Sequence, residues 1–150
     1  MWHFFRLSLL FVASLNAEAF DENLALKASQ AVIGQQVGDY RFTDSNGKPV
    51  RFADLRGKPL VVQFVYTGCF QVCPATTQFL AAAVKQAERT LGPGAFRVAT
   101  IGFNLPFDDP ASMRAFARKF GTASPNWLFL TPDTDSLSPF ARDLGFRYEA

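Results

Sequence analysis

The sequence is poor in the residues that bind metals most often. It has one histidine, His3, and two cysteines, Cys69 and Cys73, in 150 residues. A closed structural zinc site needs four Cys or His ligands, so this composition argues against one. Three residues separate the cysteines and no histidine follows them, which also excludes covalent attachment of a c-type haem.

Strong charge of either sign and long apolar runs are lacking too. The formal net charge is +2, which argues against a dedicated nucleic-acid binder, because such proteins usually carry a strongly basic face. There are no internal repeats and no low-complexity tracts. What the chain has in quantity is phenylalanine, with 17 residues, enough for a well-filled core in a single domain of this length.

The first 19 residues have the order typical of a secretory signal. Arg6 precedes a nine-residue, largely apolar run over residues 7–15, and Ala17-Glu18-Ala19 supplies the small residues that a signal peptidase reads. The run is shorter than the roughly 20 residues of a membrane-spanning helix. We expect cleavage after Ala19 and export to the periplasm or the periplasmic face of the inner membrane. The alternatives are an apolar N-terminal helix or an uncleaved anchor, through which the protein would associate with the membrane.

Cleavage at that point would divide the chain into a signal peptide (1–19), a lead-in segment (20–33) and one domain (34–150). It would also remove His3, so the exported chain would contain no histidine. The tail over residues 145–150 has the pattern of another strand that has no partner after it. We therefore expect that the C-terminal part of the domain is missing from this sequence.

The pattern of apolar residues predicts an α/β fold. Alternating residues around Asn46-Gly47 indicate a β-hairpin over residues 40–52, and an apolar run over residues 60–66 indicates a buried central strand. Further strands are expected over 96–101 and 127–130, and helices over 75–90, 110–120 and from Asp135 or Ser138 to about Leu144. This order predicts a mixed sheet flanked by helices, preceded by an N-terminal hairpin.

The two cysteines fall between the first buried strand and its helix, where open α/β sheets bind their ligands. Gly68 permits a sharp turn after the strand, and Pro74 suits the first turn of a helix. This places Cys73 at or next to the N-cap, where the positive end of the helix favours a thiolate. Two thiolates form a soft site that selects Cu(I). In an oxidising compartment the pair would rest as a disulfide bond unless a partner reduces it or a metal holds it, and a purely structural disulfide is the alternative.

Several segments resemble the Sco/SenC family. They are residues 44–58, the strand after them, Tyr66-Thr-Gly-Cys69-Phe-Gln-Val-Cys73-Pro74, Thr76-Thr77, residues 100–104, Asp108-Asp-Pro110 and Trp127-Leu128. The resemblance spans roughly residues 34–148. It implies a thioredoxin-like fold with an extra hairpin, and binding of Cu(I) or Cu(II) by Cys69, Cys73 and a distant histidine. Proteins of this family act in assembly of the copper centre of cytochrome c oxidase, as copper donors, thiol reductants or both.

The chain departs from the family pattern in two places. It ends at Ala150 without the histidine that would complete the copper site. Asn104 also stands where the family commonly has an aspartate, so a metal or supporting role for that position is in doubt. Asp108 keeps the later acidic position, and we expect it to be a surface loop or cap residue.

Three functions follow as hypotheses. The first is a metallochaperone, not itself an enzyme, that delivers Cu(I) or reducing thiols to a copper-accepting oxidase subunit. The second is an exported thiol–disulfide oxidoreductase without copper, in which Cys69 attacks the disulfide of a redox partner protein and Cys73 resolves the mixed disulfide. The third is a scaffold that binds an oxidase subunit through exposed aromatic residues such as Phe70, Phe103 and Phe107. No nucleic-acid partner is expected.

Overall fold

The computed structural model describes residues 21–120 and 124–148, so the expected signal peptide lies outside the described residues. Its elements, in chain order, are α1 (Glu22–Ala31), β1 (Arg41–Asp44), β2 (Pro49–Arg51), a short 3-10 helix η1 (Phe52–Leu55), β3 (Leu60–Val65), α2 (Val72–Leu91), β4 (Arg97–Gly102), α3 (Pro110–Phe120), β5 (Trp127–Pro132) and α4 (Thr134–Asp143). The expected order of hairpin, strands and helices is confirmed, but the described part of the tail, residues 145–148, does not form the strand expected there. The lead-in contains α1, whose first N–H groups are capped by the carboxylate of Asp21.

The predicted hairpin joins β1 and β2. Phe42 stands opposite Val50 in an antiparallel register. The carboxylate of Asp44 accepts the backbone N–H groups of Asn46 and Lys48, at 2.8 and 2.9 Å, and Gly47 adopts the positive φ of 84° that the turn requires. The turn residues therefore fix the register of this pair of strands.

The five strands form one mixed sheet in the order β2-β1-β5-β4-β3. β3, β4 and β5 run parallel, and β1 pairs antiparallel to β5. The expectation that residues 60–66 form a central strand is wrong within the described residues, because β3 lies at an edge and pairs with β4 alone. Val65 is buried and Leu60, Val62 and Phe64 pack partly against the core, whereas Val61 is exposed.

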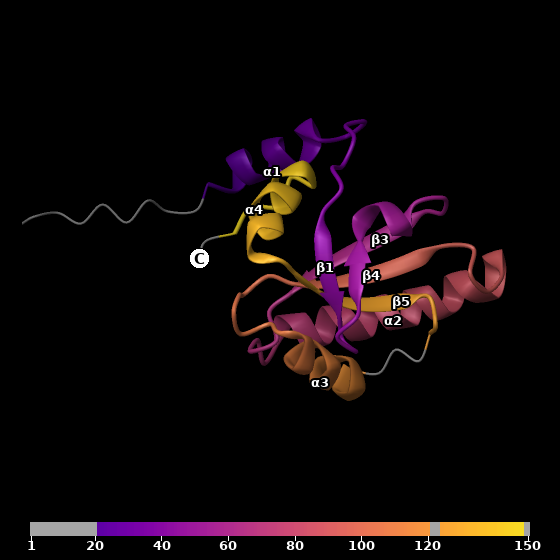
Figure 1. Cartoon of the computed structure of the whole chain (residues 1–150). Helices are drawn as coiled ribbons and strands as arrows, with labels where there is room; N and C mark the ends of the chain where they lie inside the picture. Colours follow the sequence, from indigo (N-terminus) through magenta and orange to yellow (C-terminus); the bar gives the residue numbers. More distant parts are fainter. Residues whose placement is uncertain (1–20, 121–123, 149–150) are drawn as a thin grey trace, which may run out of the picture.

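Helices cover both faces of the sheet. Figure 1 shows α2 and α3 together on one side of it and α4 on the other, with α1 beside α4. The first face buries Val65, Phe116 and Trp127 with neighbouring residues, and the second buries Phe42 and Phe140 with theirs. This two-sided core anchors the ends of β3 and β4, which carry the candidate site. None of the helices in the described part of the chain has both the length and the apolar character that crossing a membrane requires.

Candidate thiol and metal site

The segment between β3 and α2 carries both cysteines. After Val65 the chain turns through Thr67 and Gly68, and the N–H of Cys69 donates to the carbonyl of Tyr66 at 3.0 Å. A Cβ at Gly68 would lie 2.7 Å from the partly exposed ring of Tyr66, so a larger residue there would have to displace that ring. The helix begins at Val72, three residues before the expected start, which places Cys73 inside its first turn.

Cys69 takes the place of the usual helix cap. Gln71, the N-cap residue of α2, makes no side-chain capping bond, and the N–H of Cys73 donates to Sγ of Cys69 at 3.4 Å. The backbone N–H groups of Cys73 and Gln71 stabilise the thiolate and lower the pKa of Cys69 to about 7. Both thiols are partly exposed, and the lowered pKa makes Cys69 the member of the pair that is ready to attack a disulfide or to bind a soft metal.

Cys73 has the opposite character. Burial raises the pKa of its thiol, although the N–H of Tyr66 donates to its sulfur at 3.5 Å. The sequence predicts the favoured thiolate at or next to the N-cap, at Cys73. That prediction is wrong, because the N–H groups of the first turn point outward to the preceding loop, where Cys69 receives them.

Asp108 lies beneath the cysteine loop and is completely buried. Its carboxylate accepts the backbone N–H and the hydroxyl of Thr67, at 2.9 and 2.5 Å, and the backbone N–H of Asn104, at 2.8 Å. The expectation of a surface loop or cap residue is therefore wrong. Asp108 ties the start of the cysteine loop to the loop that follows β4.

A groove of about 440 Å³ opens beside Cys69. The cysteine loop forms one wall, with Phe70, and α3 forms the other, with Phe116 and Lys119. The side chain of Phe70 is 91% exposed, and Phe107 is also exposed. Phe103, the third aromatic of the scaffold hypothesis, packs instead against Phe146.

The donors around the site suit a small, soft ion. Both cysteines are free thiols and are linked by the contact between Sγ of Cys69 and the N–H of Cys73. Within the described ranges, no three Cys, His, Asp or Glu side chains gather in a way that could hold a metal ion. Two sulfur ligands fit Cu(I), whereas Cu(II) prefers an additional nitrogen or oxygen ligand. The described residues therefore fit Cu(I), and among them no further Cys, His, Asp or Glu joins the two sulfurs to make a site for Cu(II).

Comparisons with known proteins place this site in context. The family model described as SCO1/SenC matches residues 29–149. The SCO2 homologue of mouse mitochondria is 29% identical over 121 residues, covering 81% of this chain and 46% of that protein. The SCO1 homologue of Bacillus subtilis is 28% identical over 108 residues, covering 65% of this chain and 54% of that protein.

Solved structures agree. A SCO1/SenC family lipoprotein from Bacillus anthracis superposes with a TM-score of 0.65 at 29% identity, covering 72% of this chain and 64% of that chain. The copper-bound ScoI of Bradyrhizobium japonicum gives a TM-score of 0.61 at 27% identity, with 72% and 66% covered.

The fold and the cysteine pair thus define a thioredoxin-like protein with a thiol site at the end of a strand. The chain belongs to the SCO1/SenC family. It spans about half the length of the curated relatives that it matches.

Two features of the surroundings of the cysteine pair were not predicted from the sequence. The burial of Asp108 arises because the loop after β4 folds under the cysteine loop, and only the family-like position of this residue pointed to it. The second feature is Gln63, a polar residue within the apolar run that forms β3. Its position in an otherwise apolar run was the available signal, and its hydrogen-bond partners come from other elements.

Proposed function

We propose that the chain carries Cu(I) on Cys69 and Cys73 and delivers it, or the reducing equivalents of the two thiols, during assembly of the copper centre of a respiratory cytochrome c oxidase. The observation that carries the proposal is the pair of free, adjacent sulfurs at the end of β3. Membership of the SCO1/SenC family supports it, as does the copper bound to the related ScoI of Bradyrhizobium japonicum.

The unequal thiols suit a carrier that must also release its cargo. Cys69 offers a thiolate near neutral pH, because its pKa is lowered, whereas the raised pKa of Cys73 keeps its proton in place to higher pH. Because copper must displace that proton, protonation of Cys73 favours release of the metal. The exposed groove beside Cys69, lined by Phe70 and Lys119, gives a copper-accepting subunit access to the more exposed sulfur.

An anaerobic competition titration with a Cu(I) chelator tests this function. The reduced chain should bind one Cu(I), and the double variant Cys69→Ser, Cys73→Ser should bind none. Each single variant should bind at least about tenfold more weakly, because one thiolate is lost from a two-sulfur site. A wild-type chain that takes up no Cu(I), or a double variant that binds as well, would contradict copper carriage by this pair.

Thiol–disulfide exchange without copper is the second candidate, and the unequal pKa values favour it. The thiolate of Cys69 would attack a partner disulfide and form a mixed disulfide while one partner thiolate leaves. Cys73, after losing its proton to solvent, would then attack the sulfur of Cys69 and release the second partner thiolate. Two electrons pass to the partner, and the chain ends as a Cys69–Cys73 disulfide. Reduction of a disulfide-bonded model peptide by the metal-free chain, lost in Cys69→Ser, would support this candidate.

We further propose that residues 1–19 are a cleaved signal, that residues 20–33 lead into a domain over 34–150, and that the protein works in the periplasm or at the periplasmic face of the inner membrane. The relationship to a SCO1/SenC family lipoprotein supports work outside the cytoplasm. Fractionation of cells followed by N-terminal sequencing tests the proposal. An N-terminus at Phe20 in the periplasmic fraction is expected, and an intact N-terminus in the cytoplasm would contradict it.

A further inference from the structure

A line of hydrogen-bonded polar side chains, buried except for the partly buried Gln63, crosses the face of the sheet that α2 covers. The indole N–H of Trp127 on β5 donates to the hydroxyl of Thr100 on β4 at 2.8 Å. That hydroxyl donates to the amide oxygen of Gln63 on β3 at 3.2 Å, and the amide nitrogen of Gln63 donates to the hydroxyl of Thr77 on α2 at 3.0 Å. Thr77 completes the line by donating to the carbonyl of Cys73 at 2.7 Å.

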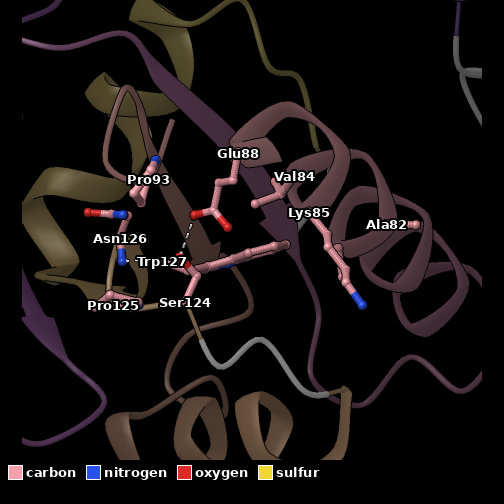
Figure 2. A pocket seen from close by; sticks show the side chains of 10 residues that line it. Ala82, Val84, Lys85, Glu88, Pro93, Ser124, Pro125, Asn126 and Trp127 are labelled. Atoms are coloured by element: carbon pink, nitrogen blue, oxygen red, sulfur yellow. Dashed lines mark hydrogen bonds between the residues drawn. The ribbon is translucent and has the colours of Figure 1, made fainter. Parts of the chain in front are cut away.

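Every step of this line runs in the same direction, so each hydroxyl both accepts and donates. Thr77 and Thr100 are fully buried, and Trp127 is almost so. Figure 2 shows the ring of Trp127 beneath Val84 and Glu88 of α2. Unpaired polar groups at such depth are costly, so the line holds together as a set rather than as separate contacts.

The line ends on the first turn of α2, where the hydroxyl of Thr76 also donates to the carbonyls of Val72 and Cys73, at 2.9 and 3.1 Å. The N-cap residue Gln71 makes no capping bond, and the N–H of Cys73 is directed to Sγ of Cys69. The position of this first turn relative to the sheet determines where the N–H of Cys73 lies. Thr77 fixes the turn from below, one helical turn after Cys73, and Gln63 connects Thr77 to the rigid strands.

We propose that Thr77 and Gln63 are positioning residues for the thiol pair. They hold the first turn of α2 against the sheet, so that the N–H of Cys73 keeps its place at the sulfur of Cys69. Cys73 is then the fixed member of the pair, tied through its carbonyl, its N–H and its sulfur, whereas Cys69 lies on the loop. This inference rests on the proposed function, because it takes the pair to be the working site.

The equilibrium of the pair with dithiothreitol tests the inference. The N–H of Cys73 donates to Cys69 as a free thiol, and it stabilises a thiolate more than the neutral sulfur of a disulfide, so loosening the turn should destabilise the reduced form more than the disulfide. We expect the equilibrium constant for oxidation to rise about threefold in Thr77→Val, which corresponds to a reduction potential about 14 mV more negative. Gln63→Leu should shift it in the same direction.

Two matched variants separate positioning from simple stability. Thr77→Ser keeps the hydroxyl and should restore the wild-type equilibrium. Thr90→Val removes a hydroxyl that bonds the carbonyl of Gln86 in the last turns of the same helix, and it should leave the equilibrium unchanged. A purely structural contact would lower the free energy of unfolding of both redox forms equally, and the equilibrium with dithiothreitol would not move.

The outcomes are distinct. An equilibrium that stays at its wild-type value in both Thr77→Val and Gln63→Leu overturns the inference alone. A shift in Thr77→Ser as large as that in Thr77→Val overturns it too, because the hydroxyl would then not be the group that matters. A wild-type pair that neither binds Cu(I) nor equilibrates with dithiothreitol overturns the proposed function, and the inference falls with it.

Discussion

The two thiols should differ sharply in reactivity, and the difference can be worked out from the structure. With a pKa of about 7, Cys69 is about 9% thiolate at pH 6, whereas a thiol at the reference value of 9.0 is about 0.1% thiolate. The more acidic thiolate is intrinsically the weaker nucleophile, by about eightfold over two pKa units. Cys69 should therefore react about tenfold faster than an ordinary thiol at pH 6, and faster still relative to Cys73, whose pKa is raised.

The assay follows the reaction of single-cysteine chains with a dipyridyl disulfide between about pH 5 and 10, a range that spans the ordinary cysteine pKa. The Cys73→Ser chain reports on Cys69 and the Cys69→Ser chain on Cys73, so no internal disulfide interferes. We expect the rate for Cys69 to rise with a midpoint near pH 7 and the rate for Cys73 with a midpoint above 9.

Unfolding provides the control, because the N–H groups that stabilise the Cys69 thiolate are held in place only in the folded chain. In concentrated guanidinium the two profiles should converge on one midpoint, that of an unperturbed cysteine. A midpoint for Cys69 as high as the reference value of 9.0 in the folded chain, or a faster reaction at Cys73, would refute the capping of α2 by the Cys69 sulfur as the cause of its low pKa.

Three further predictions concern the frame around the site, and thermal and urea unfolding check each of them. Asp108→Ala should lower the free energy of unfolding by about 3 kcal/mol, because its buried hydrogen-bond donors lose their acceptor, and an unchanged stability would contradict the role of this carboxylate as a tie. Tyr40→Phe should cost about 1 kcal/mol at pH 7 through the lost bond to Asp143, a partly exposed pair. That bond lowers the pKa of Asp143, so its contribution is present above about pH 4 and is lost as the pH falls further, and the cost of Tyr40→Phe should shrink accordingly. Phe140→Ala should cost about 3–5 kcal/mol, because Phe140 is fully buried, and a loss below about 1 kcal/mol would contradict its place in the core.

Local patterns predicted the elements well, since hairpins, helix starts and buried strands depend on neighbouring residues. Asn46-Gly47 marked the hairpin, and the alternation around it predicted residues 40–52, within one residue of the outer ends of β1 and β2. The same reasoning placed the cysteine pair at the end of a strand, where the structure has it.

What the patterns missed depends on contacts between distant segments. A strand at the edge of a sheet can have the same apolar composition as a central strand when other elements pack against it. The composition of β3 therefore does not predict its place at the edge of the sheet. The burial of Asp108 follows from the path of one loop beneath another, and the preferred thiolate follows from the direction of a few N–H groups. Neither the burial of Asp108 nor the identity of the preferred thiolate can be predicted from the spacing of residues.

Two hydrogen-bonded anchors, at Asp108 and at Thr77, explain why the two thiols differ in pKa and in their access to a partner. Asp108 ties the beginning of the cysteine loop to the loop after β4, through Thr67. Thr77 ties the beginning of α2 to the sheet, through Gln63. Between these ties only a short segment is free to respond to a metal or a partner, and it carries Cys69 and the exposed ring of Phe70. Cys73 packs partly buried against the core on the sheet side of the same turn, and this burial raises the pKa of its thiol, so its proton is retained to higher pH. A site built this way presents one reactive sulfur to a partner and keeps the second as a stationary ligand or resolving thiol, which is the arrangement that both transfer of Cu(I) and disulfide exchange require.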